Sequence, residues 1–287
     1  SQEIEFFFRK EKKVIGLNNL LNIKKKFVSN DFAIFFRNLL SIKPSIYNNS
    51  KNNKESISDF FYWDQTCDNE TKFILTNICS HVLPEINQED NVSVFIFNHD
   101  GKFLKEEKIT LKPFETSEFF FNDSDLIGKY GSFFVFHKFK EFGQLLANNC
   151  HIAERGYSGF RQNNGLWNFI HGNHYAAAIT NENEIYSLLS RTFFKTTYKM
   201  QLSTLDTNDF SIILNNPSKK NIDIVFFMYD EAKNLKIKKN LKIKPYCTEI
   251  SNFKNQNISY LEIKSNIMMC RPIIKKNYKT YFDIFHC

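Results

Sequence analysis

The sequence predicts a mainly β protein with two tandem antiparallel β-sandwich-type units and a helical N-terminal region. Three observations lead to this fold class. The chain has 287 residues, of which 42% are hydrophobic, so it can form a substantial core. Apolar and polar residues alternate with a period of two along several segments, as they do in strands. One such segment, at residues 92–116, recurs at residues 224–248.

The recurrence is strongest at the end of each copy. Residues 112–116 read KPFET and residues 244–248 read KPYCT, and the two copies align without a gap. Each copy is preceded by a strand-like run that ends in Asn, at residues 71–77 and 211–216. An apolar pattern can recur by coincidence, but a shared Lys-Pro-aromatic-x-Thr sequence is harder to obtain by chance. We therefore expect two copies of one structural unit.

The second copy shows the clearest strand periodicity. Apolar residues and lysines occupy opposite parities there: Leu235, Ile237, Leu241 and Ile243 against Lys236, Lys238, Lys242 and Lys244. Successive side chains of a strand point to opposite faces, so one face would meet a core and the other water. The lysine row could bind a polyanion, but we favour the solvated outer face of an antiparallel sheet.

Two further strands are apolar on both faces and need a cover on each side. They span residues 92–97 and 131–137, and such strands lie buried between two layers. Residues 31–43 have apolar positions at helical spacing, with Asp31 as an N-cap, so we expect this helix to supply the cover. An amphipathic helix on a membrane surface is the alternative.

These patterns define four parts of the chain. Residues 1–57 form the N-terminal helical region and a linker, and residues 58–149 form the first β-sandwich unit. Residues 150–178 are an inter-repeat segment rich in glycine and aromatic residues, and residues 179–287 form the second unit. We expect the inter-repeat segment to lie in the cleft between the two units, where ligand sites are common.

Composition narrows the classes of function. No run of about 18 apolar residues is present, so no membrane span is expected. The sequence does not open with a signal pattern, which favours a cytoplasmic location. The net charge is +7, but only six of the 38 basic residues are Arg. Nucleic-acid sites favour Arg, so nucleic-acid binding is not expected. The six cysteines contain no C-x-x-C pair and are expected to be free thiols.

The second copy resembles the β-sandwich of the sensory-rhodopsin-transducer family. The resemblance is carried by Asn216-Pro217, Ile222-Asp223-Ile224 and Tyr229-Asp230, and it continues from residues 260–265 to Arg271-Pro272. It implies a soluble ligand-binding module, with sugars among the candidate ligands. Residues 58–63, SDFFYW, resemble uncharacterised proteins associated with surface-polysaccharide synthesis. That second likeness defines no catalytic residues.

The inter-repeat segment holds the candidate site. Four of the nine glycines lie between residues 156 and 172, together with one of the two tryptophans. Long polar and aromatic connections of this kind are often functional. Flat aromatic side chains suit the C–H faces of sugar rings, and planar polar groups suit their hydroxyls. The expected ligand-binding residues are Arg155, Tyr157, Arg161, Trp167, His171, Asn173 and His174.

A metal-assisted or acid–base enzyme is the main alternative. His171 and His174 form an H-x-x-H pair, and His137 and Glu154 complete the set of candidate catalytic residues. No motif requires a cofactor, and neither a cofactor nor a metal is identified. The structural interpretation is that His137 is a hydrogen-bonded core residue, Glu154 and Arg155 form ion pairs, and Trp167 and Phe169 fill the gap between units.

Three hypotheses of function remain from the sequence. The first is a binding or accessory module for a carbohydrate-like ligand, a glycan or another small molecule, acting in surface-polysaccharide assembly. The second is the enzyme described above. The third is a structural or interaction scaffold, for which a homo-oligomer is one form. The sequence identifies neither the ligand nor a reaction.

Overall fold

The computed structural model describes residues 56–82, 84–85, 87–138, 153–172, 175–179, 185–188, 191–254, 257–267 and 271–286. Within these ranges the protein is mainly β, and the one helix is the short α3 (Ile78–Val82). The expected helical N-terminal region, including residues 31–43, lies outside the described residues. None of the described helical residues forms a segment long and apolar enough to cross a membrane.

Strands between residues 61 and 171 form two antiparallel sheets, which we call the first half of the molecule. In spatial order, one contains β2 (Phe61–Asp64), β7 (Tyr130–Lys138), β4 (Asp90–Asn98) and β5 (Phe103–Leu111). The other contains β10 (Asn168–His171), β9 (Tyr157–Gln162), β3 (Asn69–Thr76) and β6 (Thr116–Phe120). A cluster of buried apolar side chains from both sheets, including Trp63, Phe73, Val94 and Phe133, forms the core of this half.

The second half contributes two sheets with the same internal order. One contains β13 (Arg191–Gln201), β18 (Tyr260–Ile267), β15 (Ile222–Tyr229) and β16 (Leu235–Ile243). The other contains β17 (Thr248–Lys254), β14 (Asp209–Asn215), β19 (Ile273–Asn277) and β20 (Phe282–His286). Their core includes Phe210, Ile224, Phe226 and Leu261.

A fifth sheet covers the outer face of β4 and β7. It contains β12 (Ile185–Ser187), β11 (Tyr175–Ile179), β1 (Ile57–Asp59) and β8 (Ala153–Glu154), and only β8 is parallel to its neighbour. Ala176 and Ala177 of β11 pack with Phe95, Phe134 and Phe136. This sheet therefore explains why β4 and β7 are apolar on both faces. The sequence predicted that a helix would cover these strands. Among the described residues, this sheet covers them.

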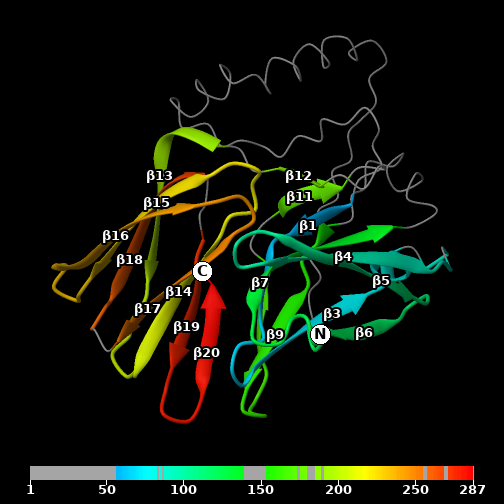
Figure 1. The fold of residues 1–287 in the computed structure, drawn as a ribbon, viewed down its shortest axis with the longest axis horizontal. Coiled ribbons are helices and arrows are strands. Elements are labelled where there is room, and N and C mark those ends of the chain that lie inside the picture. The colour runs from blue at the N-terminus through cyan, green and yellow to red at the C-terminus, as the bar shows by residue number, and fades with distance from the viewer. Residues whose placement is uncertain are drawn as a thin grey trace.

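The five small sheets have a propeller-like arrangement and do not separate clearly into two sandwiches (Figure 1). One reason is the fifth sheet, which adds a third layer to the first half. The other is an apolar cluster that joins the two halves, in which Tyr62 and Phe160 pack with Ile213, Ile273 and Phe282. Because side chains from both halves are buried at this boundary, the two halves pack against each other as one body.

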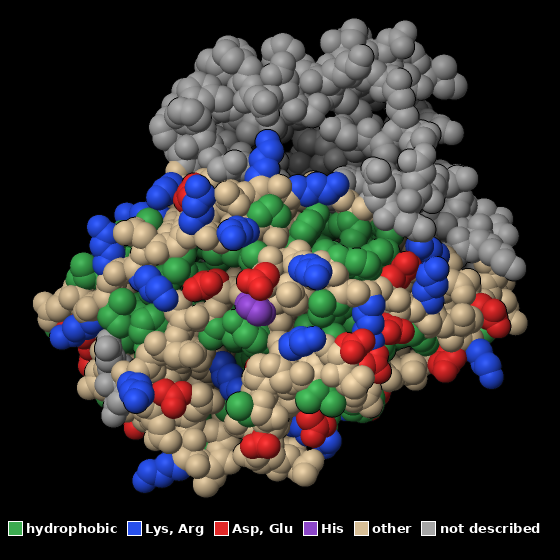
Figure 2. Space-filling view, in the orientation of Figure 1, with side chains coloured by type: hydrophobic (Ala, Val, Ile, Leu, Met, Phe, Trp, Pro, Cys, Tyr) green, Lys and Arg blue, Asp and Glu red, His purple; other side chains and the backbone are tan. Residues whose placement is uncertain are grey.

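The lysines of β16 lie on a solvated face. Lys236 and Lys238 are exposed, whereas Ile243 of the opposite parity is buried. Lys236 lies 3.0 Å from the carboxylate of Asp230, and on neighbouring strands Glu262 pairs with two further lysines. Figure 2 likewise shows basic side chains spread over one face of the molecule with acidic side chains between them.

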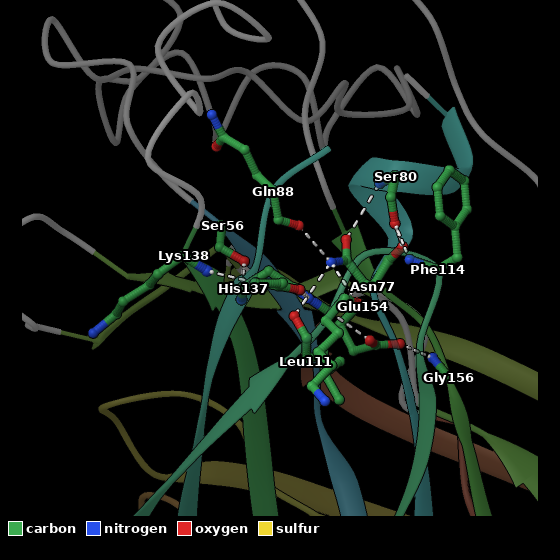
Figure 3. Close-up of polar contacts among 12 residues, drawn as sticks. Ser56, Asn77, Ser80, Gln88, Leu111, Phe114, His137, Lys138, Glu154 and Gly156 are labelled. Carbon is green, nitrogen blue, oxygen red and sulfur yellow. Dashed lines mark hydrogen bonds and ion pairs between the residues drawn. The ribbon is translucent and has the colours of Figure 1, made fainter. Parts of the chain in front are cut away.

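Two buried asparagines hold equivalent turns in the two halves. Asn77, at the end of β3, donates through Nδ2 to the carbonyl oxygens of Gln88, Leu111 and Lys112 (Figure 3). Asn216, at the end of β14, donates through Nδ2 to the carbonyl oxygens of Lys220, Ile243 and Lys244. Each asparagine therefore fixes the start of a Lys-Pro-aromatic turn. The aromatic residue of each turn, Phe114 or Tyr246, has a positive φ, at 61° and 58°.

Candidate functional site

The inter-repeat segment is part of the first half: it supplies β9 and β10 to one of the sheets there, and β8 and β11 to the fifth sheet. Its strand β10 runs beside β20 of the second half: Asn168 Nδ2 donates to the carbonyl oxygen of Phe282 over 3.2 Å. His286 Nε2 lies 2.8 Å from the carbonyl oxygen of His171 and donates to it, since a carbonyl only accepts. Phe160 and Ile170 fill the apolar boundary between the halves. The segment is thus held on both sides.

The outer face of the β10-β9-β3-β6 sheet carries a group of aromatic rings around a lysine. We call Phe120, Trp167 and Phe169, with Lys72 and Arg161, the aromatic platform. Lys72 Nζ lies 4.5 Å from the centre of the Trp167 ring, 5.6 Å from that of Phe169 and 6.0 Å from that of Phe120. Arg161 Cζ lies 4.7 Å from the Trp167 ring. Cation–π attraction orients the indole.

Strand register places these side chains in one row. Lys72 on β3 is paired with Phe120 on β6 and with Gly159 on β9, and Gly159 is paired with Phe169 on β10. A Cβ at Gly159 would lie 2.7 Å from Cε1 of Phe169. The absence of a side chain therefore lets the Phe169 ring approach the backbone of β9 at Gly159.

The platform is open to solvent and edged by charge pairs. Phe120 is 39% exposed and Phe169 43%, and Trp167 is half-buried. Lys72 Nζ donates to Glu118 over 2.6 Å. Arg161 donates to Oε2 of Glu70 from Nε over 2.9 Å and from Nη2 over 2.6 Å. The site therefore offers flat apolar faces beside fixed hydrogen-bonding groups.

His137 belongs to a separate, buried ion triad with Asp90 and Glu154. Its Nε2 lies 2.6 Å from Glu154 (Figure 3), and its Nδ1 lies 2.5 Å from Asp90. The side chains of His137 and Asp90 are fully buried. Burial alone would lower the pKa of His137, but the charges and hydrogen bonds of Asp90 and Glu154 outweigh it and raise the pKa to about 10. Both ring nitrogens carry protons, so neither has a lone pair for a metal.

A second polar group, the seam cluster, lies where β1, β8, β10 and β20 approach one another. It comprises Asp59, Arg155, His171, Arg271 and His286. Arg155 Nε lies 3.4 Å from Oδ2 of Asp59. The rings of His171 and His286 stand edge to face with centres 4.0 Å apart. The charge of Arg271 acts on Asp59 and on both histidines.

Burial shifts the proton affinities of the seam cluster. Asp59 is fully buried, and this burial raises its pKa to about 7 although Arg155 opposes the shift. Burial also lowers the pKa of His171, and burial together with the charges of His171 and Arg271 lowers the pKa of His286 to about 4. Both histidines are therefore neutral near neutral pH, and Asp59 is poised between its two protonation states.

The predicted site residues fall into three places. Arg161 and Trp167 belong to the aromatic platform, Arg155 and His171 to the seam cluster, and His137 and Glu154 to the ion triad. Tyr157 is 39% exposed and lies edge to face with His171, with ring centres 6.5 Å apart. Asn173 and His174 lie outside the described residues. Within the described ranges, no three His, Cys, Asp or Glu side chains are grouped so that they could hold a metal ion.

Five of the residues at these two sites were not among the sequence candidates. Lys72, Phe120 and Phe169 join the platform through cross-strand pairing, which one sequence does not reveal. Asp59 and Arg271 join the seam cluster from positions far apart along the chain. A sixth, His286, was noted in the sequence only as a C-terminal residue able to bind adventitious metal.

Comparisons with known proteins leave the identity open. No family model matches the chain, and no curated protein matches it. Among solved structures, a β-glucuronidase from glycoside hydrolase family 2 is 10% identical, with 79% of this chain and 23% of that chain covered and a TM-score of 0.17. The structure of infectious bursal disease virus Gx strain is 6% identical, with 76% and 54% covered and a TM-score of 0.15. This chain thus spans about a quarter and about half of the two proteins, and neither likeness identifies its fold or its function.

Proposed function

We propose that the protein is a binding or accessory module for a carbohydrate-like ligand, whose ring lies on the aromatic platform, and that it acts in surface-polysaccharide assembly. The observation that carries the proposal is the row of solvent-facing rings of Phe120, Trp167 and Phe169 around Lys72. Aromatic faces exposed to water cost free energy. A ligand that offers apolar groups to the rings and polar groups to their surroundings offsets this cost when it covers them.

The chemistry of the platform suits a sugar ring. A pyranose presents apolar C–H groups on its faces and hydroxyls around its edge, and the platform pairs flat rings with carboxylate and guanidinium groups at its border. Lys72 and Arg161 are each held by a carboxylate, so their positions are fixed before a ligand arrives. Phe160 and Ile170 fill the boundary between the halves, which argues against Trp167 as the residue that fills that gap.

A binding experiment with a matched control tests the proposal. Trp167→Ala should weaken glycan binding by at least about tenfold, the equivalent of about 1.4 kcal/mol, while the melting temperature changes little. Tyr281→Ala is the control, because Tyr281 is a 63% exposed aromatic residue in the β19–β20 turn, outside the platform. Binding of an identified glycan that is equal in wild type and Trp167→Ala contradicts the proposal.

We also propose that the two halves are copies of one sandwich-type unit. The supporting observation is topological: β3 and β14 each pair with the two equivalent neighbours, β6 and β9 in one half and β17 and β19 in the other. The equivalent roles of Asn77 and Asn216 add independent support. Removal of either asparagine should then destabilise its own half in the same way.

The ion triad reduces the number of candidate catalytic residues that the enzyme alternative can use. His137 and Glu154 are occupied with one another, which leaves His171 as the described candidate from the sequence. Asp59, with a pKa of about 7, is the group in the seam cluster best matched to general acid–base work near neutral pH. Turnover of a glycoside or sugar ester that is lost in Asp59→Asn would favour this alternative.

A further inference from the structure

The β4–β5 hairpin of the first half packs on the Lys-Pro-aromatic turn of the second half. We call this turn, residues 244–248, the covered turn. The backbone N–H of Thr248 donates to the carbonyl oxygen of His99, at the tip of the hairpin, over 2.9 Å. The Tyr246 ring stacks on Phe97 at the base of the hairpin, with ring centres 5.0 Å apart. The contact therefore combines a backbone hydrogen bond at the tip with an aromatic stack at the base.

A glycine at the tip of the hairpin makes this contact possible. Gly101 has a φ of 75°, which residues with a side chain rarely adopt. A Cβ there would overlap the carbonyl oxygen of Pro245 and lie 3.0 Å from the backbone nitrogen of Cys247. Both are backbone atoms of a turn that Asn216 holds in place through two hydrogen bonds. Any side chain at this position would therefore push the hairpin away from the turn.

The equivalent turn of the first half, residues 112–116, lacks such a cover, and we call it the open turn. Both turns have a hydrogen bond from the fourth residue to the first, of 3.1 Å and 3.2 Å, and a positive φ at the third. Ser80 Oγ accepts from the N–H of Phe114 over 2.7 Å (Figure 3), and the His81 ring stands edge to face with the Phe114 ring. Phe114 is still 50% exposed. The helix α3 thus supports one side of the turn and leaves half of the ring in solvent.

The open turn also presents an outward-pointing backbone donor. Asn77 N donates to Glu115 O over 2.9 Å, so the next pair along these strands, Thr76 and Thr116, is not hydrogen-bonded through the backbone. The N–H of Thr116 therefore points away from β3, toward the edge of the sheet that β6 forms. Thr116 is exposed, whereas Thr248, whose N–H binds the hairpin in the covered turn, is buried.

The second half carries a hairpin of the same form, with lysine in place of the glycine. The β15–β16 tip repeats the backbone hydrogen bonds of the β4–β5 tip, from Asp230 N to Asn234 O over 3.1 Å and from Lys233 N to Asp230 O over 3.0 Å. Lys233 has a φ of 64°, close to the 75° of Gly101. If this hairpin met the open turn of a second copy in the same way, the Lys233 side chain would overlap the carbonyl oxygen of Pro113. Lys233 therefore opposes head-to-tail association of copies of this chain, which could extend without limit.

We propose that the open turn is the docking surface for a β-hairpin of a partner protein, and that this hairpin has a glycine at its tip and an aromatic residue at its base. The aromatic residue stacks on Phe114, a carbonyl oxygen of the tip accepts from the N–H of Thr116, and the glycine lies against Pro113. These contacts are the ones that the β4–β5 hairpin makes with the covered turn. Lys233 excludes the second hairpin of this chain, so the surface stays available to the partner. The inference goes beyond the proposed sugar binding and does not depend on it.

A second copy with glycine at position 233 supplies a hairpin of the required form. The donor chain is Lys233→Gly/Phe114→Ser, which presents its own hairpin but has lost the aromatic residue of its own open turn. Tyr229 of the donor takes the place of Phe97, since both lie at the base of their hairpin after a register shift. Sedimentation velocity of the donor mixed with the wild-type protein should show a complex of one donor with one wild-type chain, which neither protein forms alone.

Matched variants identify the contacts. Lys233→Ala/Phe114→Ser removes the same lysine charge but keeps a Cβ at position 233, so it should bind the wild-type protein at least about tenfold more weakly than the glycine donor does. As acceptors in place of the wild type, Phe114→Ser and Thr116→Pro should each abolish the complex. The first removes the ring, and the second removes the N–H at an edge strand, where proline is tolerated. Melting temperatures report whether each variant folds.

The outcomes are distinct. A complex that needs glycine in the donor, and that the acceptor variants abolish, supports the inference. The absence of a complex with the glycine donor, or equal binding of the glycine and alanine donors, overturns it. A complex that a folded Phe114→Ser or Thr116→Pro acceptor forms at wild-type strength also overturns it, because the hairpin would then bind elsewhere. If one acceptor variant unfolds, the other decides.

Discussion

The ion triad of Asp90, His137 and Glu154 makes the stability of the fold depend on pH in a defined direction. The pKa of His137 rises from 6.5 to about 10 in the folded protein. Between these two values the folded protein binds more protons than the unfolded chain does. The stabilisation is therefore complete below the lower pKa and is lost as the pH rises toward the higher one.

The size of the effect follows from the shift. One pH unit inside this window changes the free energy of unfolding by at most about 1.4 kcal/mol, so a rise from about pH 7 to about pH 8.5 should lower it by about 2 kcal/mol. Most of the change in this window comes from His137, and Asp59 adds a small change in the same direction at its lower end. The pKa values of Asp59, His171 and His286 lie at or below about 7, and burial raises that of Cys79 to about 11.

Urea unfolding at the two pH values, followed by the fluorescence of the buried Trp63, measures the change. Glu154→Gln keeps a hydrogen-bond acceptor for His137 but removes one negative charge, so it should flatten the pH dependence. His99→Gln, which alters an exposed histidine, should keep the wild-type slope. A free energy of unfolding that stays constant or rises from pH 7 to 8.5 would refute the view that His137 is a buried cation.

Three further substitutions test local features of the fold and the platform. Asn77→Ala and Asn216→Ala should each lower the free energy of unfolding by about 2–3 kcal/mol in urea titrations, because buried carbonyls lose a donor; losses below about 0.5 kcal/mol would contradict the role of the turns. Gly159→Ala should displace the Phe169 ring and weaken glycan binding severalfold with less than about 1 kcal/mol change in stability, since that ring is exposed. Unaltered binding in calorimetry would show that the Phe169 ring does not contact the ligand.

Most of the predictions about the fold came from the alternation of apolar and polar residues along the strands. In β16 the alternation is confirmed for the buried Ile243 and the partly buried Ile237 and Leu241, but it is wrong for Leu235, which is 51% exposed at the start of the strand. The doubly apolar β4 and β7 are buried on both faces. The identity of the cover was not predictable in the same way. The described cover includes Ala176 and Ala177, and alanine has no strong preference for strands, so the AAAI run gives little indication of a sheet.

Cross-strand register accounts for the part of the site that the sequence did not predict. Trp167 and Arg161 stand out because Trp and Arg are rare in this chain, but Lys72 is one lysine among many. Its place at the centre of the platform depends on pairing with residues 48 positions ahead and 87 positions ahead, at Phe120 and Gly159. A shift of one residue in either pairing would turn Lys72 to the other face, and nothing in the local sequence fixes that register.

Two glycines of the inter-repeat segment permit close approaches between groups. Gly159 and Gly172 lack a positive φ, so a left-handed backbone does not explain them. They are needed because other groups occupy the space of their Cβ atoms: the Phe169 ring at Gly159, and Asp59 with Phe61 at Gly172. Each glycine thus permits one close approach, the first within the aromatic platform and the second beside the seam cluster. A side chain at Gly159 should therefore impair glycan binding at the platform, whereas crowding at Gly172 acts on the buried Asp59 and Phe61 and should lower the melting temperature.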